Sequence, residues 1–244
     1  MGIAAMFYGL ICYGVFLLVF LYAVCFVENI VVPKTIDSGA AGPIAVALVV
    51  NALLLGLFAV QHSVMARQGF KESWTKIVPR SVERSTYVLI SSLLLSLLFW
   101  QWRPIPQPVW EVEAPALRTV LWILCAVGWL TLLASTFMIN HFDLFGLRQV
   151  YLRMVNKPYT HLPFTQTLLY KYVRHPLYLG FLIAFWAAPS MSLGHLLFAV
   201  ATTGYILVGV TFEERDLVRY LGEPYVAYRK KVPMLFPLGR GKGS

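Results

Sequence analysis

The chain has 244 residues, of which 59% are hydrophobic and only 13% are charged. Soluble domains carry about 45–50% apolar and about 25% charged residues, so this composition excludes a soluble globular protein and indicates an integral membrane protein. The net charge of +9 is compatible with nucleic-acid binding, but the basic residues stand between apolar segments and not on one polar face. We therefore expect membrane lipids as partners and no nucleic acid.

Apolar runs recur along the whole chain. Because a transmembrane helix needs about 20 apolar residues, we expect about six, near residues 3–27, 43–65, 87–102, 117–139, 177–189 and 193–212. The last two are separated only by PSMSLG, which predicts a C-terminal helical hairpin whose first arm is short for a full crossing. No internal repeat or linker is visible. The predicted fold is thus an all-α integral membrane protein with one domain, 1–244.

Lys and Arg are distributed unevenly between the predicted loops. With a cytoplasmic N-terminus, the cytoplasmic loops hold seventeen of the 20 Lys and Arg, and the external loops hold Lys34, Arg103 and Arg118. Positive charge concentrates in cytoplasmic loops, so we expect both termini in the cytoplasm. Within the spans, Gln61 and His62 suit hydrogen bonds between helices. No charged residue lies deep inside a span, which argues against an ion-coupled transporter.

The first candidate site is YVRHPLYLG, residues 172–180. Pro176 lacks a backbone N–H and suits the first position of a helix, so a helix is expected to begin there. The unpaired N–H groups of that first turn form an anion site beside the side chains of Arg174 and His175. Interfacial anchoring is the alternative role for these two residues.

Polar residues also follow the fourth predicted span. In NHFDLFGLRQVYLRMV, the apolar residues between 147 and 155 recur at helical spacing, which predicts an amphipathic helix at the cytoplasmic interface. Ahead of it, His141 and Asp143 suit a general base with an orienting carboxylate, or other polar groups that bind a ligand. A hydrated helix end is the alternative.

Two adjacent carboxylates, Glu213 and Glu214, stand where the sixth predicted span ends. Paired acids so close to a bilayer are costly unless they have partners. From Leu217 to Tyr228 the apolar and aromatic residues follow a helical spacing, which Gly222 and Pro224 interrupt. We expect a helix with an apolar and aromatic face and a basic end suited to anionic lipid headgroups.

RHPLYLG, the helical hairpin and EERDL…GEPYVAYRKKVPMLFP together resemble the C-terminal signature of the integral-membrane methyltransferases related to isoprenylcysteine carboxyl methyltransferase. The upstream NHFDLFGLRQVYL resembles the nurim-like branch of that family. The resemblance implies an S-adenosylmethionine pocket capped from the cytosol and formed by about residues 140–237. Carried over by position, the cofactor-binding residues are Arg174, His175, Pro176, Tyr178, Gly180, Glu213 and Glu214.

The activity that the resemblance implies is methylation of a small thiol, methanethiol, to dimethyl sulfide. Its cofactor carries a sulfonium, an ammonium and a carboxylate, which suit carboxylates, arginine and helix N–H groups. A thiol of pKa about 8.5 needs a base near pH 7, and His141 is the candidate, with Asp143 as its orienting carboxylate and Arg148 holding the thiolate. Methylation of a lipid-like thiol or amine, and a structural role without catalysis, stay open. The sequence shows no GxGxxG cradle and no metal-ligand cluster.

Overall fold

The computed structural model describes residues 2–160 and 162–237. The chain divides into two compact units, and each is described by itself. Unit 1 comprises Met1–Val109, Asn140–His161 and Ser192–Leu197, and unit 2 comprises Trp110–Ile139, Leu162–Met191 and Phe198–Ser244. Apart from one pair of short strands, β1 and β2, the described regular structure is helical. The expected all-α class is therefore confirmed.

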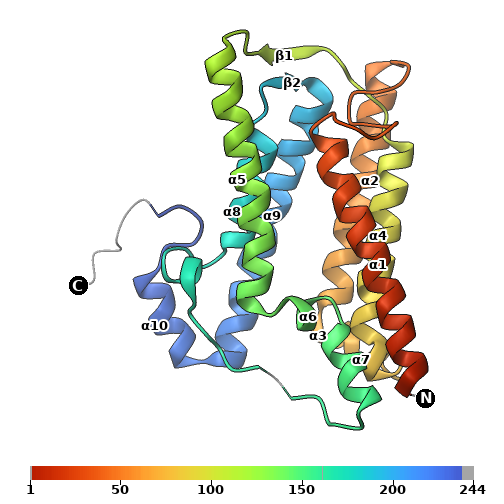
Figure 1. The fold of residues 1–244 in the computed structure, drawn as a ribbon, viewed down its shortest axis with the longest axis vertical. Helices are drawn as coiled ribbons and strands as arrows, with labels where there is room; N and C mark the ends of the chain where they lie inside the picture. The colour runs from red at the N-terminus through yellow and green to blue at the C-terminus, as the bar shows by residue number, and fades with distance from the viewer. Residues whose placement is uncertain (1, 161, 238–244) are drawn as a thin grey trace. The chain divides into compact units, whose positions relative to one another are not determined.

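The helices and strands follow one another as Figure 1 shows. In chain order they are α1 (Gly2–Val27), α2 (Ile44–Ala66), α3 (Gln68–Trp74), α4 (Arg80–Gln101), β1 (Pro108–Glu111), α5 (Pro115–Ile139), α6 (His141–Leu144), α7 (Leu147–Met154), a 3-10 turn (Leu168–Lys171), α8 (Pro176–Trp186), β2 (Ser190–Ser192), α9 (Leu193–Leu221) and α10 (Glu223–Lys231).

Five of these helices, α1, α2, α4, α5 and α9, are long and apolar enough to cross a membrane. The sixth expected span is α8, which has 11 residues and so measures about 16 Å, roughly half of a 30 Å hydrocarbon core. Two expected boundaries were wrong. α4 begins at residue 80 instead of 87, and α9 continues to residue 221 instead of 212, because helical backbone hydrogen bonds continue beyond the apolar residues from which the spans were predicted. The orientation of the spans stays a prediction, and residues 1 and 238–244 lie outside the described ranges.

In unit 1, α1 packs against α4 and the amphipathic α7, and α2 packs against α4 (Figure 1). A Cβ built on Gly9 would lie 2.5 Å from the side chain of fully buried Val150, so the glycine lets α7 approach α1 closely. The expected interhelical bonds are present. The Tyr87 hydroxyl lies 2.9 Å from His62 Nε2, and Ser91 donates to Gln61 at 3.3 Å.

In unit 2, α5 and α8 pack with their backbones in close contact. A Cβ on Gly128 would meet the backbone N of Ala184 at 2.6 Å, and one on Gly180 would meet the backbone N of Leu132 at 2.6 Å. As expected, the helix after the last span is interrupted at Gly222, whose φ of 64° ends α9 and separates it from α10. Tyr225 and Tyr228 on α10 form a buried cluster with apolar residues of α9.

Candidate functional site

The N-terminus of α8 is fixed by the C-terminal segment of unit 2. His175 is the residue before the helix, and Pro176 occupies its first turn, as the sequence predicts. The backbone N–H of Arg174 donates to Pro233 O at 2.9 Å, and that of His175 donates to Met234 O at 3.1 Å. These two bonds place both side chains beside the end of α9.

Arg174 and Glu214 form a buried ion pair. Arg174 Nε lies 2.6 Å from Glu214 Oε1, and the two side chains are only 10% and 8% exposed. The guanidinium also donates to the carbonyl oxygens of Val232 at 2.6 Å and Arg229 at 3.0 Å. Because a buried charge is costly without partners, these bonds explain how α9 carries a carboxylate at this position.

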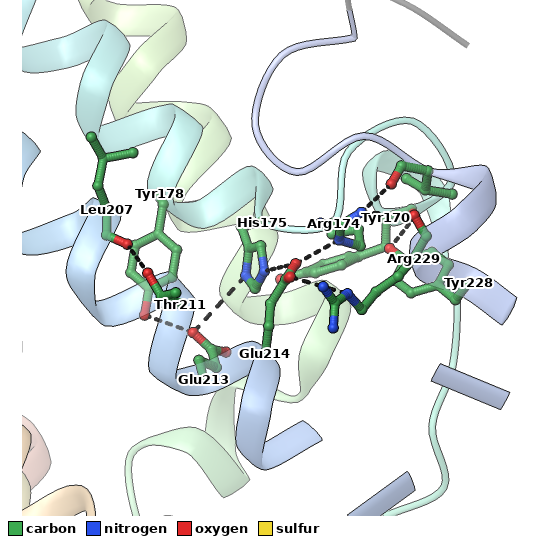
Figure 2. Close-up of polar contacts among 11 residues, drawn as sticks. Tyr170, Arg174, His175, Tyr178, Leu207, Thr211, Glu213, Glu214, Tyr228 and Arg229 are labelled. Carbon is green, nitrogen blue, oxygen red and sulfur yellow. Dashed lines mark hydrogen bonds and ion pairs between the residues drawn. The ribbon is translucent and has the colours of Figure 1, made fainter. Parts of the chain in front are cut away.

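Glu214 has two further partners, which Figure 2 shows around its carboxylate. His175 Nε2 lies 3.2 Å from Oε1, and Arg229 Nε lies 3.3 Å from Oε2. His175 is itself 5% exposed. One carboxylate therefore links the start of α8, the end of α9 and α10.

Glu213, the neighbouring acid, has a different environment. Its carboxylate accepts a hydrogen bond from the Tyr178 hydroxyl at 2.9 Å, and its Oε2 lies 3.9 Å from His175 Nδ1 (Figure 2). The Glu213 side chain is 44% exposed, against 8% for Glu214. Glu214 is thus enclosed by cations, whereas Glu213 keeps an open side that a positively charged ligand can approach.

Aromatic side chains lie near this cluster. The rings of Tyr225, Tyr228 and Phe164 lie 5.4–5.8 Å apart, and Tyr228 donates to Tyr170 O at 2.5 Å. The buried Tyr225 hydroxyl has no hydrogen-bond partner among the described residues. Burial raises the pKa of Tyr225, with a further contribution from the charge of Glu214, so this hydroxyl stays protonated and offers a donor.

A cavity of about 320 Å³ adjoins the cluster, lined by Arg174, Val226, Arg229 and Lys230. Three of these four residues are cationic. The cavity therefore favours an anionic group, while the carboxylate of Glu213 favours a cation. Unit 2 can hold a ligand that carries both charges.

In unit 1, His141 is buried, with 4% of its surface exposed. Its Nε2 lies 2.8 Å from the Tyr13 hydroxyl on α1, and its ring packs 4.8 Å from that of Phe145. Burial lowers the pKa of His141, because the apolar surroundings disfavour the charged ring. The neutral imidazole that results is the form that accepts a proton.

Asp143 and Arg148 are paired with each other. Arg148 Nη1 lies 3.0 Å from Asp143 Oδ1, and it also donates to Thr160 O at 2.8 Å. The Tyr159 hydroxyl donates to Asp143 Oδ2 at 3.2 Å, and Gln149 Nε2 donates to Asp143 O at 3.1 Å. These bonds tie α6 and α7 to the segment that follows them.

The residues that the sequence singles out thus fall into two groups. Unit 2 brings together Arg174, His175, Tyr178, Glu213 and Glu214, with Pro176 in the first turn of α8. Gly180 lies against α5, where it allows close helix packing. Unit 1 holds His141, and it pairs Asp143 with Arg148.

Sequence reasoning did not find three participants: Arg229 beside Glu214, Tyr13 beside His141 and Tyr159 beside Asp143. Arg229 lies in a basic run whose expected role was contact with lipid headgroups. Glu214, Tyr225 and Arg229 are spaced as on one face of a continuous helix, which could have indicated that Arg229 lies near Glu214. The expected interruption at Gly222 argued against such a continuous helix. Tyr13 gives no signal, because 128 residues separate it from His141.

Comparisons with known proteins extend over nearly the whole chain. The family described as NnrU protein matches residues 50–213. The chain is 60% identical over 230 residues to the methanethiol S-methyltransferase of Mycobacterium tuberculosis, covering 94% of each protein. It is 52% identical over 230 residues to that of Crocosphaera subtropica, covering 94% of this chain and 90% of the relative. Nurim of Homo sapiens is 32% identical over 176 residues, 69% of this chain and 66% of nurim. No solved structure gives a significant match.

Proposed function

This chain belongs to the NnrU protein family and has methanethiol S-methyltransferases among its relatives, and we propose that it methylates methanethiol to dimethyl sulfide with S-adenosylmethionine as donor. The observation that carries the proposal is the charged cluster of unit 2, in which Glu213 keeps an exposed carboxylate and Arg174, the partner of Glu214, lines a cationic cavity. A structural membrane protein has no need for this arrangement at the end of two apolar helices.

The side chains of unit 2 fit the charges of S-adenosylmethionine. Arg174, Arg229 and Lys230 around the cavity suit its carboxylate, and the half-exposed Glu213 suits its ammonium or sulfonium. When bound, this cofactor supplies a methyl group on a sulfonium, which is already activated for transfer.

The protein's remaining task is to position the thiol and remove its proton. We assign proton removal to His141, because its lowered pKa keeps the ring neutral near pH 7. In this role the neutral ring takes up the thiol proton, and the Tyr13 hydroxyl, 2.8 Å from Nε2, holds the orientation of the ring. Tyr13 is better placed than Asp143 to orient the ring, since the Asp143 carboxylate already accepts bonds from Arg148 and Tyr159.

Asp143 and Arg148 act together in this proposal. Their ion pair, with the bonds from Arg148 to Thr160, fixes the segment that follows His141. Arginine has five N–H donors, and Asp143 and Thr160 accept bonds from three of those of Arg148, so in this proposal the guanidinium can also donate to a thiolate. Small-molecule thiols are thus the proposed substrates, and the cytoplasm, where the donor is made available, is the proposed side.

Binding of the donor is tested by calorimetric titration of the purified protein with S-adenosylhomocysteine. We expect saturable binding that His175→Ala weakens about ten- to a hundredfold, as loss of a charged hydrogen bond predicts. If the wild-type protein did not bind S-adenosylhomocysteine, a structural role without catalysis would be favoured instead. Initial rates with methanethiol, longer alkyl thiols and lipid thiols then identify the acceptor, and kcat/KM rising with chain length would favour the lipid alternative.

A further inference from the structure

Unit 1 contains a second cavity, of about 870 Å³, to which the proposed reaction assigns no donor or substrate, although Asp143 forms part of its lining. Its walls come from α3, the first turn of α4, α6 with α7, and the segment around Tyr159. All of its lining residues belong to unit 1. The cavity is large enough for a small polar molecule or a lipid headgroup.

The lining of this cavity is positively charged. Five basic residues, among them Lys71, Arg153 and Lys157, face three acidic ones, and one of these acids, Asp143, is already paired with Arg148. Burial and the nearby Arg84 guanidinium lower the pKa of the Lys71 ammonium group, and the Glu83 carboxylate offsets part of this effect. An anion between such cations would relieve their repulsion.

The start of α4 adds to this preference. Pro79, Arg80 and Ser81 line the cavity, and no side chain caps the helix N-terminus at Pro79. The first N–H groups of a 22-residue helix carry partial positive charge and are suited to phosphate or carboxylate oxygens. The basic side chains and the backbone N–H groups of α4 therefore both favour an anionic group.

Two buried hydrogen-bond acceptors in the lining need hydrogen-bond donors, which an anionic group alone does not supply. Glu83 Oε1 and Gln149 Oε1 are buried without a hydrogen-bond partner in the described structure, and both residues line the cavity. The Gln149 amide is held in this orientation because its Nε2 donates to Asp143 O at 3.1 Å and to Asp143 Oδ1 at 3.4 Å. Unpaired buried acceptors are costly, so the ligand should bring hydrogen-bond donors as well as negative charge.

We propose that this cavity binds a phosphoethanolamine group, with its phosphate on the basic residues and the α4 N-terminus and its ammonium on Glu83 and Gln149. The ammonium provides N–H donors and a positive charge for the Glu83 carboxylate. A membrane lipid is the favoured source, because α4 is a candidate span and its N-terminal end lies where headgroups are found. Free phosphoethanolamine shares the chemistry, and the experiment separates the two.

Phosphatidylcholine is the matched probe, because it keeps the phosphate but its quaternary ammonium has no N–H donor. The full-length protein in detergent is titrated with short-chain phosphatidylethanolamine, short-chain phosphatidylcholine and free O-phosphoethanolamine, and binding is followed by microscale thermophoresis. We expect the ethanolamine lipid to bind at least about tenfold more tightly than the choline lipid, as loss of a charged hydrogen bond predicts.

Two variants locate the site. Glu83→Gln should reduce the preference for ethanolamine over choline, and Lys157→Gln should weaken both lipids about equally. Lys76→Gln, at an exposed residue of the same region that does not line the cavity, should change neither. Binding of free O-phosphoethanolamine with the same variant pattern identifies a soluble source. Equal binding of the two lipids, or a preference that Glu83→Gln leaves intact, would overturn the proposal.

Discussion

Replacing each of the two adjacent acids of α9 by glutamine should have different consequences. Glu214 accepts from Arg174 Nε at 2.6 Å and lies 3.3 Å from Arg229 Nε, with 8% of its side chain exposed. Removing one partner of a buried ion pair costs about 3–5 kcal/mol, because the other charge is left without compensation. Glu214→Gln should therefore lower the free energy of unfolding by roughly this amount, and weaker donor binding should follow from the loosened cluster.

Glu213→Gln removes a charge that is 44% exposed and that accepts one bond, from Tyr178 at 2.9 Å. Pairs this exposed contribute about 0–1 kcal/mol to stability, so unfolding should change little. If Glu213 faces the cation of the donor, affinity should fall about ten- to a hundredfold. Thermal unfolding in detergent measures the first effect, and calorimetric titration with S-adenosylmethionine, which carries both the sulfonium and the ammonium, measures the second. Equal loss of stability in both variants, or unchanged affinity in Glu213→Gln, would refute this division of roles.

Other predictions concern the base, the helix packing and the topology. Burial lowers the pKa of His141 below its usual 6.5. The ring is therefore neutral at pH 6.5 and above, and it becomes protonated only when the pH falls below this lowered pKa. The kcat/KM of the wild type should then be flat between about pH 6.5 and 8, whereas that of His141→Ala should rise about tenfold per pH unit with the thiolate fraction. Tyr13→Phe should lower kcat about tenfold, with KM unchanged and the pH profile still flat. If this variant kept the kcat of the wild type, Tyr13 would not be the residue that positions His141. Gly180→Leu should lower the thermal unfolding midpoint, since a Cβ meets backbone at 2.6 Å, while Gly204→Leu, with open space at its Cβ, should not. A reporter inserted near Lys157 should be cytoplasmic, and an external signal would reverse the assigned orientation.

Local rules predicted the parts of the structure that depend on neighbouring residues. Pro176 marks the start of α8 because its ring suits a first turn, and Gly222 separates α9 from α10 through its positive φ. The amphipathic α7 follows from the spacing of its apolar residues. Each of these features is determined within a few residues along the chain.

The limits of the prediction lie where long-range partners decide. The run of apolar residues predicts that the last span ends near residue 212, but α9 continues to residue 221. It can do so because Arg174 and Arg229, from other segments, neutralise Glu214. The basic run around Arg229 resembles a headgroup-binding end, and only the folded unit turns that side chain toward a carboxylate. Gly180 lies inside the stretch for which the family resemblance implied cofactor binding, but whether it faces a ligand or the backbone of α5 depends on packing. The pairing of His141 with Tyr13 is likewise a matter of tertiary structure.

Transfer of a labelled methyl group tests thiol methylation most directly. Purified protein is incubated with S-adenosylmethionine carrying a trideuterated methyl group and with unlabelled methanethiol, and the headspace gas is separated and analysed by mass spectrometry. We predict trideuterated dimethyl sulfide, formed in equal amount to S-adenosylhomocysteine and strongly reduced in Glu213→Gln and His141→Ala. A protein that binds S-adenosylhomocysteine but yields no labelled dimethyl sulfide would contradict the assigned reaction.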